Sequence, residues 1–70
     1  MAGATDILLN GAPYQVAPGA SLADLIEALA LSNQALALAV NRQIVPRQQW
    51  RERAVIAGDQ VEVVRAIGGG

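Results

Sequence analysis

The chain has no cysteine, no histidine and no lysine among its 70 residues, and its only aromatic side chains are one Trp and one Tyr. Without cysteine there can be no disulfide scaffold, thiolate nucleophile or cysteine-based metal site. Without histidine the chain lacks the usual general base near neutral pH, the common catalytic triads and a frequent metal ligand. We therefore expect a protein that binds no cofactor or metal and enters a reaction as a substrate, not as an enzyme.

The charges are few and balanced. Five arginines and six acidic residues give a net charge of -1. The charges are scattered singly, so no basic face can neutralise a phosphate backbone, which argues against nucleic acid as a partner. No apolar run approaches the roughly 18 residues of a membrane span, and the first residues do not resemble a signal peptide. These features predict a cytoplasmic protein with no membrane partner.

What the chain does have is enough apolar residues for one small domain. Hydrophobic residues make up 53% of the sequence, which indicates a packed globule. A core of this size is only marginally able to stabilise its fold. We expect a single domain over residues 1–67, frayed at 1–5, and a glycine tail at 68–70.

The first predicted unit is a β-hairpin over residues 6–16. An apolar run, 7–9, leads into Asn10-Gly11, the dipeptide that best tolerates the positive φ angles of a type I′ turn. Pro13 follows, at a place where a strand can accept a residue without an N–H donor. The second strand is expected at about residues 14–17.

A helix is predicted to begin after Ser21, whose hydroxyl can cap the first turn with Asp24 at the third helical position. Ser21 is interpreted as a cap and not as a nucleophile, because the chain offers no base. The apolar residues recur at helical spacing, at Leu22, Leu25, Ile26 and Leu29. Ser32-Asn33 is expected to end the helix, and the apolar face needs a sheet to pack on, because so short a helix is barely stable alone.

Residues 36–41 alternate between large and small side chains. A strand would turn one set toward the helix, Leu36, Leu38 and Val40, and present a flat opposite face of Ala37 and Ala39. Alanine and leucine also favour a helix here. We prefer the strand because the preceding helix requires a sheet.

The next segment is predicted to begin extended at Ile44 and to end in a short turn near Trp50, since Pro46 disfavours helix before it. We expect Trp50 to cover the sheet edge, with ligand stacking as the alternative. Arg47 is expected either to solvate the bend or to bind an anion.

Two further strands are predicted, at residues 54–56 and 61–67, with a turn between them. After Val63 the inward and outward alternation breaks, because Val64 falls on the outer side and Arg65 on the side of the core. We expect the strand to leave the globule there, with Val64 and Ile67 exposed as a candidate contact surface.

Together these elements predict an α+β fold. If the first and last strands pair in parallel at the centre, one helix crosses one face of a mixed sheet of four to five strands, which is a β-grasp (ubiquitin-like) fold. The three terminal glycines have no side chains, so any chemistry there must use the carboxylate of Gly70. A loose end or a cloning remnant would have the same composition.

The ordered set of motifs resembles the ubiquitin-like sulfur carriers of thiamine thiazole synthesis, the ThiS family, over nearly the whole chain. The matching segments are residues 7–11, 21–26, 39–41, 45–47 with Trp50, 58–62 and the terminal Gly-Gly. The Val-Pro-Arg-Gln-Gln-Trp segment separates this family from the molybdopterin synthase small subunits, which are usually longer. Gly68 departs from the family pattern, in which a small residue with a side chain is expected.

The resemblance implies a reaction at Gly70. A ThiF-like adenylyltransferase would use ATP to adenylate its carboxylate, a desulfurase or sulfurtransferase would supply sulfur, and a ThiG-like thiazole synthase would consume the resulting thiocarboxylate. Gly68 and Gly69 would thread the tail through a narrow channel, since they have no Cβ. The candidate partner-binding residues are Val64, Ile67, Arg65, Ala37, Ala39, Arg42 and Arg47.

Three alternatives stay open at this point. The chain could serve as the small subunit of molybdopterin synthase or as a carrier for another sulfur metabolite. It could be a ubiquitin-like protein modifier that forms an amide bond to lysine. It could also be a β-grasp interaction module whose glycines have no chemical role.

Overall fold

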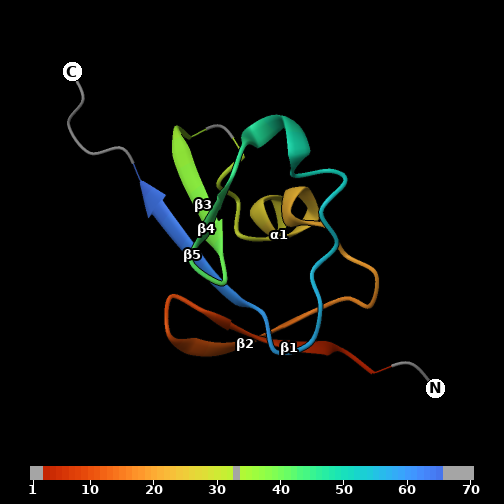
Figure 1. Cartoon of the computed structure of the whole chain (residues 1–70). Helices are drawn as coiled ribbons and strands as arrows, with labels where there is room; N and C mark the ends of the chain where they lie inside the picture. Colours follow the sequence, from red (N-terminus) through yellow and green to blue (C-terminus); the bar gives the residue numbers. More distant parts are fainter. Residues whose placement is uncertain (1–2, 33, 66–70) are drawn as a thin grey trace.

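A single mixed sheet with one helix across it makes up the computed structural model, which describes residues 3–32 and 34–65 (Figure 1). The elements are β1 (Thr5–Leu9), β2 (Ala12–Val16), α1 (Leu22–Ala28), β3 (Leu36–Val40), β4 (Gln43–Val45), the 3₁₀ helix η1 (Arg47–Gln49) and β5 (Gln60–Arg65). The five strands lie in the order β2-β1-β5-β3-β4, and β1 and β5 pair in parallel at the centre. The predicted β-grasp fold is confirmed.

The β1–β2 hairpin turns at Asn10 and Gly11, whose φ angles of 51° and 83° are those expected for a type I′ turn. Two boundaries were predicted wrongly. β1 begins at Thr5, inside the segment expected to fray, and β2 begins before Pro13. Pro13 fits within the strand because its partner Leu8 donates its N–H to the Asp59 carbonyl on the other side, so the proline nitrogen faces the outer edge of the sheet.

The helix α1 begins with the predicted capping box. Ser21 Oγ accepts a hydrogen bond from Asp24 N at 3.2 Å, and Asp24 Oδ2 accepts one from Ser21 N at 3.0 Å. The helix ends at Ala28, before the expected stop at Ser32-Asn33, and Asn33 itself lies outside the described residues. Ala30 takes a left-handed φ of 60°, which lets Leu31 donate to the Ile26 carbonyl and closes the last turn.

The core lies between α1 and the inner face of the sheet. Its largest fully buried side chains are Leu22, Leu25, Ile26, Leu38 and Val61. Trp50 closes one side of this core, where its indole N–H donates to the Val45 carbonyl at 2.8 Å. The expectation that Trp50 is a covering side chain is confirmed.

Residues 54–56 do not form the predicted strand. Ala54 makes one isolated antiparallel bridge with Ser21, flanked by hydrogen bonds from Leu22 N to the Arg53 carbonyl and from Val55 N to the Ala20 carbonyl. The pairing cannot extend further, because the chain enters α1 directly after Ser21.

The strand β5 stays in the sheet longer than predicted. Its pairing with β3 continues to Arg65, which lies opposite Leu36. The strand therefore does not leave the sheet at Val64, since β3 is long enough to pair with it. Ile67 and the glycine tail lie outside the described residues. Within residues 3–32 and 34–65, no helix is long and apolar enough to cross a membrane.

Candidate functional site

The central strand β5 brings the chain toward Gly70. It lies between β1 and β3, and in Figure 1 its arrow runs beside β3 and away from the β1–β2 hairpin. Gly68, Gly69 and Gly70 lie outside the described residues, as does Ile67. The structure adds to this predicted site the surface around β5, the strand that precedes it in the chain.

An apolar surface lies on the side of the sheet opposite α1. We call it the sheet face and define it by Leu8, Ala37, Ala39, Ile44, Glu62 and Val64. Ile44 and Val64 are 70% and 60% exposed, and Leu8 is 37% exposed. The strand register places Ala37 beside Val64 and places Ala39 between Ile44 and Glu62. Four neighbouring strands, β1, β5, β3 and β4, thus share an exposed stripe that offers mainly apolar contact.

The two alanines predicted to form an open face differ in exposure. Ala37 is exposed, whereas Ala39 is 9% exposed because Ile44 and Glu62 flank it on the neighbouring strands. Ala39 therefore contributes little surface of its own.

Leu8 and Ile44 are members of the sheet face that our sequence reasoning missed. Each belongs to a short apolar run in which Ile7, Leu9 or Val45 turns the other way. Strict alternation of inward and outward side chains along each strand would have placed Leu8 and Ile44 on the face of the sheet opposite the helix.

The three candidate arginines do not lie together. Arg42 is exposed in the β3–β4 turn and lines a shallow hollow with Leu8 and Glu62, next to the sheet face. Arg65 is exposed at the end of β5.

Arg47 lies on the α1 side of the molecule, because the chain turns at Pro46 from β4 into η1. Its guanidinium donates to the Gln34 carbonyl at 2.9 Å and stacks over the Trp50 ring, 4.7 Å from the centroid. These contacts already occupy the side chain, and Arg47 lies apart from the partner-binding candidates Val64 and Ala37 on the sheet face.

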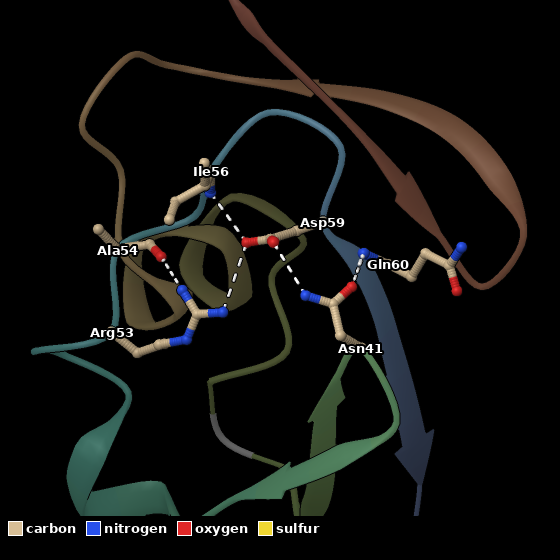
Figure 2. A network of polar contacts seen from close by, with 6 residues as sticks. All are labelled: Asn41, Arg53, Ala54, Ile56, Asp59 and Gln60. Carbon is tan, nitrogen blue, oxygen red and sulfur yellow. Dashed lines mark hydrogen bonds and ion pairs between the residues drawn. The ribbon is translucent and has the colours of Figure 1, made fainter.

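A polar network fixes the start of β5 (Figure 2). Asp59 is 7% exposed and accepts hydrogen bonds from Ile56 N at 2.9 Å and Asn41 Nδ2 at 3.2 Å. Its Oδ2 also lies 3.6 Å from the Arg53 guanidinium, and Asn41 Oδ1 accepts from Gln60 N at 3.0 Å. This carboxylate has partners for both oxygens, so we interpret it as structural. Sequence reasoning matched the motif containing Asp59 but did not identify this role.

The described residues offer no cluster that could hold a metal. No group of three or more acidic side chains comes together in residues 3–32 and 34–65, and the chain has no histidine or cysteine.

The parallel central pair, the single crossing helix and the exposed sheet face define the chain as a ubiquitin-like β-grasp protein. The model of the ThiS family matches residues 7–70. The sulfur carrier protein ThiS of Escherichia coli (strain K12) is 42% identical over 64 residues, which cover 91% of this chain and 97% of that protein. The chain belongs to the ThiS family.

Two further comparisons cover a similar share of this chain. A crystal structure of the thiamine biosynthesis protein ThiS from Geobacter metallireducens superposes with a TM-score of 0.79 at 28% identity, covering 94% of this chain and 100% of that one. The uncharacterized protein ycf40 of Porphyra purpurea is 27% identical over 64 residues, covering 91% of this chain and 90% of that protein. The likeness therefore covers nearly the whole domain.

Proposed function

We propose that Gly70 is the reactive end of this sulfur carrier of thiamine biosynthesis. A partner adenylyltransferase joins the Gly70 carboxylate to AMP and releases pyrophosphate from ATP. Sulfur at the oxidation level of sulfide then attacks the acyl-adenylate, displaces AMP and leaves a thiocarboxylate, which thiazole synthase uses. Where the donor is a persulfide, a thiol releases this sulfur and forms a disulfide with the donor. The observation that carries the proposal is the family match, which runs through to Gly70.

The residues suit this chemistry. A carboxylate is a poor electrophile until one oxygen becomes a good leaving group, and the arriving sulfur must reach an unhindered carbonyl carbon. Glycine obstructs that carbon least and allows the tail to lie close to the walls of a channel. In this scheme the chain is a substrate of two enzymes and not a catalyst. A cytoplasmic location belongs to the proposal, because the adenylation step consumes ATP.

The glycine tail can reach a partner's active site only if the domain itself binds to that partner. Residues 67–70 span at most roughly 13 to 14 Å when extended, so the domain must sit at the mouth of the partner's site. Ordering three glycines costs about 3 to 6 kcal/mol. We propose that contacts on the sheet face, centred on Val64 and Ile44, offset this cost, with Arg42 at the edge of that face and Arg65 on the opposite side of the end of β5 as further contacts.

Intact-mass measurement tests the proposal. The chain is incubated with ATP, a ThiF-like adenylyltransferase and a sulfur source, and a parallel sample without ATP is the control. A carrier exchanges one oxygen for one sulfur, a protein modifier forms larger adducts, and an inert module keeps its mass. A charged chain that feeds a molybdopterin synthase large subunit but not thiazole synthase would support the alternative sulfur carrier.

A further inference from the structure

The two neighbours of β5 end at different points along it. On one side β3 pairs with β5 as far as Arg65, opposite Leu36. On the other side β1 pairs only through Leu8 with Gln60 and Leu9 with Val61. The last part of β5 therefore extends beyond the end of β1, as Figure 1 shows.

The hydrogen bonds between β1 and β5 show which backbone groups of β5 have no partner on β1. Leu8 N donates to the Asp59 carbonyl at 3.0 Å, and Asn10 N donates to the Val61 carbonyl at 2.9 Å. Because successive residues of a strand point their backbone groups to opposite sides, the Val63 carbonyl and the Arg65 N–H face the side of β1. They lie past its last pair, so β1 offers them no partner.

Asn10 marks the end of that pairing. Its side-chain Oδ1 accepts the Val63 N–H at 2.9 Å, in the place of a further strand carbonyl. The chain then turns away through Asn10 and Gly11 into β2. We call the side of residues 63–65 that faces β1 the open edge of β5.

The outer edges of the sheet are protected in a way that the open edge is not. Pro13 turns its nitrogen to the outer edge of β2, and β4 is only three residues long and is followed by Pro46. Proline and short strands are the usual protection against unwanted strand pairing. The open edge has the β-branched Val63 and Val64 and no proline.

We propose that the open edge accepts an extended segment of the adenylating partner by strand addition, with hydrogen bonds to the Val63 carbonyl and the Arg65 N–H. This inference rests on the proposed function. Gly70 is only five residue steps beyond Arg65, a reach of at most roughly 16 to 18 Å, so a protein that holds the Gly70 carboxylate must lie close to this edge.

The neighbouring side chains indicate what that segment contains. Val64 is on the sheet face, so an apolar partner residue beside it would continue the apolar stripe. Arg65 is exposed on the opposite side of the strand and favours an acidic partner residue. Backbone hydrogen bonds would provide affinity, and these two side chains specificity. The added strand would also hold the start of the tail extended.

The test compares Arg65→Pro with Arg65→Ala. On the open edge the Val63 N–H already donates to Asn10 Oδ1, so proline at position 65 removes the N–H that is left for a partner. It leaves the β3 side untouched, because the backbone groups of Glu62 and Val64 face β3. Alanine removes the charge and keeps the N–H. We expect Arg65→Pro to lower kcat/KM for charging by the adenylyltransferase about tenfold or more, and Arg65→Ala by less than about threefold. Thermal unfolding of both variants checks that they fold.

Amide hydrogen exchange of the wild-type chain gives a second measurement that requires no variant. The Arg65 N–H is expected to be protected in the complex and to exchange fast in the free chain. An unprotected Arg65 N–H in a charging-competent complex, or equal charging of the two variants, overturns the inference and leaves the proposed function intact. Protection in the free chain together with dimer formation assigns the edge to a second copy and also overturns it. A wild-type chain that is never charged removes the proposed function and this inference together.

Discussion

Asn41 Nδ2 donates to Asp59 Oδ1 at 3.2 Å across 18 residues of sequence. The same Asn41 accepts the Gln60 N–H through its Oδ1, so one side chain joins the β3–β4 turn to the first residues of β5. This contact fixes where β5 begins against β3, and therefore how far the strand extends toward the tail.

We expect Asp59→Ala to lower the free energy of unfolding by about 1 to 3 kcal/mol, because the substitution leaves the Ile56 N–H and the Asn41 amide without their acceptor in a partly buried place. Urea unfolding measures the change. Asp6→Ala is the matched control, since Asp6 is exposed and its bond from Gln15 Nε2 lies at the surface. An equal effect of both substitutions would show that the network adds no stability.

Asn10 combines a left-handed backbone with the hydrogen bond to Val63 N. Asn10→Gly keeps the backbone conformation and removes only the acceptor, whereas Asn10→Ala removes both features. We expect a loss of about 1 kcal/mol for glycine and about 2 to 3 kcal/mol for alanine. Urea unfolding measures both variants, and the Val63 amide should exchange faster in each. Glycine as destabilising as alanine would argue against a role for the backbone angle.

Val64→Asp is expected to weaken binding to the adenylyltransferase about tenfold or more while it changes the unfolding free energy little, because Val64 is 60% exposed on the sheet face. Ile56→Asp is a closely matched control, since Ile56 is 61% exposed but lies in the loop before β5. Isothermal titration calorimetry compares the two affinities. Equal affinities would place the docking surface elsewhere.

Deletion of Gly70 is expected to abolish thiocarboxylate formation without unfolding the domain, since the described core contains no residue beyond Val63. Intact mass reports the charging, and far-ultraviolet circular dichroism reports the fold. Ser21→Ala is a suitable contrast, because loss of the capping box should cost about 1 kcal/mol of stability and leave charging intact. Equal thiocarboxylate yield from the truncated chain would contradict the role given to Gly70.

Local chemistry made several features predictable from the sequence. Asn10-Gly11 requires a turn with positive φ, Ser21 and Asp24 form a capping box, and the spacing of Leu22, Leu25 and Ile26 defines a buried helix face. Each of these depends on residues within a few positions of one another. The family resemblance also depends on short motifs of this kind, and the comparisons with known proteins confirm it.

Other features depended on residues far apart in the chain. Ala39 is buried because Ile44 and Glu62 happen to flank it, Arg47 lies on the α1 side because the chain turns at Pro46, and β5 continues to Arg65 because β3 is there to pair with it. The absence of cysteine and histidine, together with the terminal glycines, led to the prediction from sequence alone that the chemistry occurs at the Gly70 carboxylate. Only the tertiary structure decided which side chains and which strand edge lie beside the last described residues of β5, because strand order and register bring together residues that no local pattern connects.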